Sequence, residues 1–74
     1  MLPQGEKMQP HQERVVAERD ELQGKVERLE TFIGRGSPGP IFTKLPVAEQ
    51  CRLDRQFALM RLYLAVLNER IQEF

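Results

Sequence analysis

The chain has 74 residues, and its 11 basic and 11 acidic side chains give it a formal net charge of zero at pH 7. A core of this size rarely supplies more than ~3–5 kcal/mol, so we expect a single domain reinforced by oligomerisation, since Cys51 is the only cysteine and excludes an internal disulfide. The lone thiol indicates that the protein works in a reducing cytosol. No apolar run approaches the ~18–20 residues that a membrane-spanning helix needs. The balanced charge argues against a DNA-binding protein.

The N-terminal part of the sequence predicts a short polar segment followed by a helix. Residues 1–9 have no apolar core, so we expect a flexible segment or a short turn and no signal peptide. A helix is predicted at 10–34, where Pro10 suits the first turn because its missing N–H costs nothing there. Glu21 and Lys25 are spaced for a favourable pair on the charged face of this helix. The opposite face carries an apolar heptad stripe of Val15, Leu22, Val26, Leu29 and Ile33.

A linker is predicted at residues 35–45, because glycines and prolines fill the stretch from Gly34 to Pro40. Gly34 can adopt the left-handed conformation that ends a helix, and the prolines prevent the helix from continuing. Three apolar residues are expected to fold as a clip over the end of the hairpin, namely Ile41, Phe42 and Leu45. Pro46 then starts a second helix at 46–73.

The second helix has more apolar surface than one partner helix can cover. A heptad seam is formed by Leu53, Phe57, Met60, Leu64, Leu67, Ile71 and Phe74. A further apolar set outside the seam contains Leu59, Leu62, Tyr63 and Val66. We therefore predict an all-α fold, an antiparallel two-helix hairpin domain over residues 10–74, which assembles into a helical homo-oligomer with Tyr63 packed at the interface.

The sequence lacks the side-chain arrangements that catalysis needs. It has one histidine and one cysteine, so neither a Ser/His/Asp nor a Cys/His arrangement has support, and no Cys and His spacing suits a metal. The glycines between positions 34 and 39 are flanked by prolines and follow no strand, which argues against a phosphate-binding loop. We therefore expect a protein that is not an enzyme, takes no cofactor and functions by binding.

Polar residues set within the apolar pattern carry a family resemblance. The pattern comprises Arg14-Val15-Val16, Glu18, Leu22, Lys25, Arg28-Leu29, Phe32-Ile33, Ile41-Phe42, Leu45-Pro46, Glu69-Arg70-Ile71 and Phe74. It covers about residues 10–74 and resembles the helical-hairpin domain of phage anti-CBASS sponges, a domain shared with a sponge that acts against the Thoeris defence system. The resemblance implies a phage protein that works in the host cytoplasm, binds cyclic dinucleotide or cyclic trinucleotide immune messengers, and withholds them from their effector without cleaving them. It also implies a homo-oligomer, a hexamer, with ligands bound between protomers and no membrane or DNA partner.

The resemblance implies cationic ligand-binding residues on both helices. Arg28 stands directly before Leu29, where the family has a lysine that binds phosphate, and Lys25 lies one turn earlier. Arg70 matches an arginine that the family places near its C-terminus. Such cations bind phosphate through charge-assisted hydrogen bonds. Together with two residues near the start of the first helix, the implied ligand-binding set is His11, Arg14, Lys25, Arg28 and Arg70.

The chain departs from the family where the family has a stacking aromatic near the start of the first helix. No Phe, Tyr or Trp precedes Phe32. The one ring near the helix start is that of His11, with Arg14 one turn further on, and either this imidazole or a guanidinium is expected to stack on a base in place of the family's aromatic. The chain departs from the family at a second position as well. The family's trinucleotide site has a threonine shortly after its phosphate-binding lysine, and this chain has Glu30 at that position, followed by Thr31.

One alternative function remains open from the sequence. A small helical protein-interaction module could dock on a host protein and inhibit it, in which case the broad apolar face would bind that partner instead of a second copy. A nucleic-acid binder is disfavoured, because the chain has no net positive charge and no contiguous basic stripe.

Overall fold

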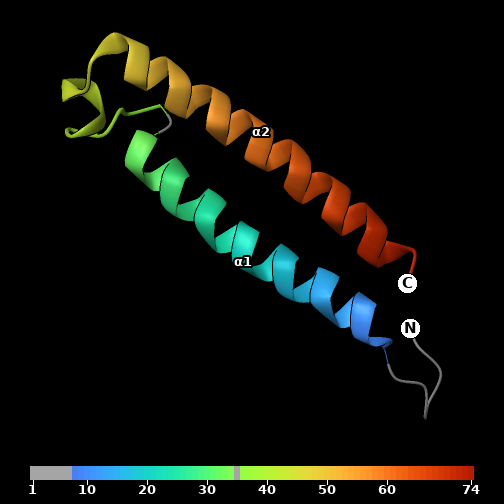
Figure 1. The fold of residues 1–74 in the computed structure, drawn as a ribbon. Helices are drawn as coiled ribbons and strands as arrows, with labels where there is room; N and C mark the ends of the chain where they lie inside the picture. Colours follow the sequence, from blue (N-terminus) through green and yellow to red (C-terminus); the bar gives the residue numbers. More distant parts are fainter. Residues whose placement is uncertain (1–7, 35) are drawn as a thin grey trace.

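The protein folds as two long helices that run antiparallel, side by side, so that the first helix begins at the end of the rod where the second helix ends (Figure 1). The computed structural model describes residues 8–34 and 36–74, so most of the segment predicted at 1–9 lies outside the described residues. The helices are α1, Pro10–Ile33, and α2, Val47–Gln72, and a short 3-10 helix, η1, covers Phe42–Lys44 between them. The described residues contain no strand, which confirms the all-α, two-helix prediction.

Local hydrogen bonds define the two ends of α1. At its start the side-chain oxygen Oε1 of Gln12 accepts the backbone N–H of Gln9 at 2.9 Å. At its end Gly34 is left-handed, with φ of 71°, and donates its N–H to the carbonyl of Glu30. A Cβ at position 34 would lie 2.4 Å from the carbonyl oxygen of Ser37, so this position requires glycine for both its conformation and its space.

The connection between the helices is packed by one aromatic side chain. Phe42 is buried and its ring meets that of Phe32 edge to face, with the ring centroids 6.3 Å apart. Ile41 is 63% exposed, so the prediction that it joins an apolar clip is wrong. Successive residues of a 3-10 turn point about 120° apart, so Ile41 faces away when Phe42 faces inward. Gln50 donates its Nε2–H to the carbonyl of Leu45 at 2.8 Å and ties the loop to α2.

The core is a single apolar seam between α1 and α2, as the heptad pattern predicts. Its buried members are Val15, Leu22, Val26 and Leu67, and the half-buried side chains packed against them are Phe57, Met60, Leu64, Ile71 and Phe74. Leu67 is completely buried, with 0% of its surface exposed. Each helix thus buries one stripe and leaves the rest of its surface in water.

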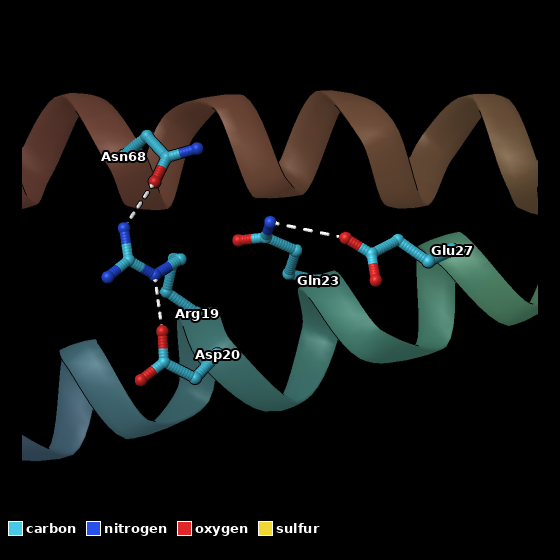
Figure 2. A network of polar contacts seen from close by, with 5 residues as sticks. All are labelled: Arg19, Asp20, Gln23, Glu27 and Asn68. Carbon is cyan, nitrogen blue, oxygen red and sulfur yellow. Dashed lines mark hydrogen bonds and ion pairs between the residues drawn. The ribbon is translucent and has the colours of Figure 1, made fainter.

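A polar contact joins the helices beside this seam. Arg19 donates through Nη1 to Oδ1 of Asn68 at 2.9 Å, and its Nε is 2.7 Å from Oδ1 of Asp20 (Figure 2). On the same helix Gln23 donates to Glu27 at 3.3 Å. The guanidinium of Arg19 therefore bridges the two helices, and its contact with Asn68 shows which positions of α1 and α2 lie level with each other.

The apolar residues that the sequence places outside the seam are exposed in the hairpin. This exposed stripe on α2 consists of Leu59 at 66%, Leu62 at 65%, Tyr63 at 45% and Val66 at 49% exposure. The prediction that one hairpin cannot cover these side chains is confirmed. Contiguous exposed apolar surface on a small protein marks a place where something else binds.

Candidate functional site

The five residues predicted to bind a ligand all lie on the surface of the hairpin. They are His11, Arg14, Lys25 and Arg28 on α1 and Arg70 in the last turn of α2. Lys25 forms the predicted ion pair with Glu21, with Nζ 3.2 Å from Oε1. Within residues 8–34 and 36–74, the side chains of the other four form no hydrogen bond or ion pair. Their charged and polar groups are accessible to a ligand.

Two of these residues line the same groove along one edge of the hairpin. This interhelical groove has a volume of about 490 Å³ and is lined by Arg14, Ala17, Glu18, Glu21, Leu22, Lys25 and Tyr63. Its α1 residues recur at spacings of three and four, which places them on one face of the helix. Arg14 and Lys25 are separated by about 16 Å along the axis, since each helical residue rises 1.5 Å.

Tyr63 brings an aromatic ring from α2 into the groove formed mainly by α1. The sequence offers no Phe, Tyr or Trp near the start of the first helix, and the structure places this half-exposed ring in the groove that Arg14 and Lys25 also line. The register explains the placement. Arg19 faces Asn68, so Tyr63, five residues before Asn68, lies level with position 24, five residues after Arg19. The sequence alone does not give this register, but once the register is known, the spacing along α2 identifies Tyr63 as a residue of the groove.

The interhelical groove has a balanced set of charges. Arg14 and Lys25 contribute two cations, and Glu18 and Glu21 contribute two carboxylates. The Lys25–Glu21 pair is well exposed, with 54% and 71% of the two side chains in contact with solvent, so it is worth about 0.3–0.5 kcal/mol at most. An anionic ligand can displace this pair at small cost, while the guanidinium of Arg14 is already available.

Arg28 occupies a separate, smaller groove of about 290 Å³ on α1, lined by Gly24, Glu27, Arg28 and Thr31. The guanidinium of Arg28 folds back over Gly24, and a Cβ built at position 24 would lie only 3.2 Å from its Nη1. Thr31 donates its hydroxyl to the carbonyl of Glu27 at 3.0 Å. The structure therefore places Arg28 next to Thr31 and apart from the groove that contains Arg14 and Lys25.

His11 and Arg70 lie at the open end of the hairpin, where α1 begins and α2 ends (Figure 1). Neither lines the interhelical groove or the Arg28 groove. Arg70 follows Leu59, Tyr63 and Val66 at spacings of four, three and four, so it continues the exposed stripe on α2. The five predicted residues thus fall into three places, and only Arg14 and Lys25 share a groove.

Comparison with known protein families identifies the chain. The family model described as Sequestin matches residues 9–73, nearly its whole length. The chain belongs to the Sequestin family. This match confirms the family resemblance seen in the sequence, and the family name indicates a protein that sequesters a signalling molecule. The comparison with curated proteins finds no match, and the comparison with solved structures finds none either.

The surface chemistry of this Sequestin hairpin is that of a binding protein. The interhelical groove combines a guanidinium and an ammonium group, groups of the kind that pair with phosphates, with an aromatic ring, a group of the kind on which flat bases stack. In the part of the chain that the structure describes, no cluster of three His, Cys, Asp or Glu side chains is arranged to hold a metal ion. Neither α1 nor α2 is long and apolar enough to cross a bilayer.

Proposed function

We propose that the protein is a phage sponge that binds cyclic dinucleotide or cyclic trinucleotide immune messengers in the host cytoplasm and withholds them from their effector without cleaving them. Membership of the Sequestin family supports sequestration as the activity. The observation that carries the nucleotide part is the groove that combines Arg14, Lys25 and the ring of Tyr63. A cyclic nucleotide presents the matching chemistry, because it alternates anionic phosphates with flat bases.

The proposed ligand-binding residues are the five named from the sequence together with Tyr63. Arg14 and Lys25 bind phosphates in the interhelical groove, and Tyr63 stacks on a base. Arg28 is proposed to bind a second phosphate beside Thr31. His11 and Arg70 are proposed to complete the site from the open end of a hairpin domain that spans residues 10–74.

Tight binding requires more enclosure than one hairpin offers. A sponge that holds free messenger at nanomolar levels needs about −12 kcal/mol of binding free energy. The interhelical groove is open to solvent along the rod, and the exposed stripe of Leu59, Leu62, Tyr63 and Val66 lies next to it through Tyr63. We propose a homohexamer that buries this stripe between copies and encloses the ligand between protomers.

The test is binding followed by recovery of the ligand. Purified protein is titrated calorimetrically with cyclic dinucleotides, cyclic trinucleotides and pyrophosphate-containing nucleotides. The bound ligand is then released by heat and identified by mass spectrometry. We expect submicromolar binding of a cyclic di- or trinucleotide and recovery of the intact compound. Recovery of a cleaved product would contradict sequestration, and tight binding of pyrophosphate nucleotides alone would contradict the proposed messenger class.

A second candidate function is a protein-interaction module that docks on a host protein and inhibits it. The same exposed apolar stripe on α2 favours it, since such a surface suits either a second copy or a foreign protein. Light scattering separates the two functions. A stable monomer that binds no nucleotide supports the interaction module, whereas a defined oligomer that binds nucleotide supports the sponge.

A further inference from the structure

A second groove on α2 adjoins the interhelical groove. This α2 groove has a volume of about 640 Å³ and is lined by Arg52, Arg55, Gln56, Leu59, Met60 and Tyr63. Tyr63 lines both grooves, so its ring stands at their junction. The two grooves together therefore present cations on either side of one aromatic side chain.

The charge of the α2 groove is positive, in contrast to the balanced charge of the interhelical groove. Its lining contains two arginines and no acidic residue. Arg52 is paired with Glu49 outside the lining, with Nε 2.8 Å from Oε1. The guanidinium of Arg55 forms no hydrogen bond or ion pair with any residue that the structure describes. Its donors are therefore available for an anion.

The remaining lining suits a flat, partly apolar group. Leu59 is 66% exposed and Tyr63 is 45% exposed, so the ligand would find apolar surface next to the arginines. Gln56 directs its Nε2 toward the sulfur of Met60 at 3.8 Å, which leaves its amide oxygen as an unused acceptor. A base that stacks on Tyr63 could donate a hydrogen bond to this oxygen.

We infer that the α2 groove is the second half of the messenger site, in which Arg55 and Arg52 bind a phosphate while Tyr63 stacks on a base of the same ligand. This inference rests on the proposed nucleotide sponge. A purely apolar partner surface would bury the charge of Arg55 without compensation, which is costly, whereas a phosphate neutralises it. The charge of the groove therefore favours a phosphorylated ligand inside the groove, while Leu62 and Val66, which do not line it, remain for the interface between copies.

The experiment compares four variants with the wild-type protein, using cyclic di-AMP and cyclic tri-AMP as probes. Arg55→Ala removes the proposed phosphate contact, Tyr63→Leu keeps an apolar side chain but removes the ring, and Tyr63→Phe keeps the ring. Arg61→Ala is the matched control, because Arg61 lies on the same helix but over the ring of Phe57, 5.7 Å from its centroid, and lines none of the grooves described above. Calorimetry gives the Kd, and light scattering gives the mass of each variant.

We expect Arg55→Ala to weaken the tighter probe about 10- to 100-fold, as for a lost hydrogen bond to a charged group. Tyr63→Leu should weaken it about 5- to 100-fold through lost stacking, while Tyr63→Phe and Arg61→Ala stay within about twofold of wild type. The mass should not change. Wild-type affinity in Arg55→Ala would overturn the α2 site and leave the sponge function intact. Loss of the oligomer in Arg55→Ala or Tyr63→Leu would assign the groove to a second copy instead. Failure of the wild type to bind these two probes and every other cyclic di- or trinucleotide titrated under the proposed function would overturn both proposals.

Discussion

Gly24→Ala is expected to stabilise the protein while weakening ligand binding. Alanine is favoured over glycine by about 0.8–1.0 kcal/mol inside a helix, and Gly24 lies in the middle of α1. The added Cβ would lie 3.2 Å from Nη1 of Arg28 and 3.9 Å from its Cζ, so the guanidinium must move by a few tenths of an ångström. Because this group is the end of a flexible side chain, most of the helix stabilisation is retained, about 0.5–1 kcal/mol.

The expected rise in Tm is about 2–8 °C, since 1 kcal/mol shifts the midpoint of a domain of this size by about 4–8 °C. Circular dichroism at one protein concentration measures it, because the Tm of an oligomer depends on concentration. Messenger affinity should fall several-fold if Arg28 binds phosphate from its folded-back position. The same substitution in an Arg28→Ala background should then cause no further loss.

Two results would refute this reasoning. A lower Tm for Gly24→Ala would mean that α1 cannot accommodate a Cβ at this position, contrary to the geometry. An equal loss of affinity in the Arg28→Ala background would show that Gly24 acts on binding by a route other than the guanidinium.

Three further predictions concern the core, the cap and the exposed stripe. Leu67→Ala should cost about 2–5 kcal/mol in thermal or urea unfolding, and Leu64→Ala should cost less because Leu64 is only half-buried. Gly34→Ala should destabilise the protein more than Gly36→Ala in the same assay. Both glycines have positive φ, but a Cβ at position 34 would lie 2.4 Å from the carbonyl oxygen of Ser37, whereas a Cβ at position 36 would have no neighbour within 4 Å. Leu62→Glu, at a side chain that is 65% exposed, should abolish the oligomer in light scattering while leaving helical content unchanged, and an intact oligomer would exclude Leu62 from the interface.

The helices and the seam were predictable because their signals are local. Gly34 ends α1, and apolar residues recur with a helical period on both helices. Ile41 was misplaced because apolar character alone does not tell which residue of a short turn faces inward. Phe42 takes the inward position and packs on Phe32.

The candidate site was only partly predictable, because it depends on contacts between the helices. Arg14 and Lys25 share a groove because both lie on one face of α1, which their spacing already indicates. Tyr63 joins them through the register set beside Arg19 and Asn68, and a helical period does not specify that register. Arg55 resembles any solvated arginine in the sequence, and only the absence of acidic neighbours in its groove distinguishes it.

The position of Tyr63 at the junction of the two grooves gives the protein an intrinsic optical reporter. The chain has one tyrosine and no tryptophan, so fluorescence excited at wavelengths that phenylalanine does not absorb arises from this single ring. A base stacked on the ring would quench that emission, and a ligand bound elsewhere would leave it largely unchanged. Occupancy, and the number of ligands per oligomer, can therefore be followed in the unlabelled wild-type protein.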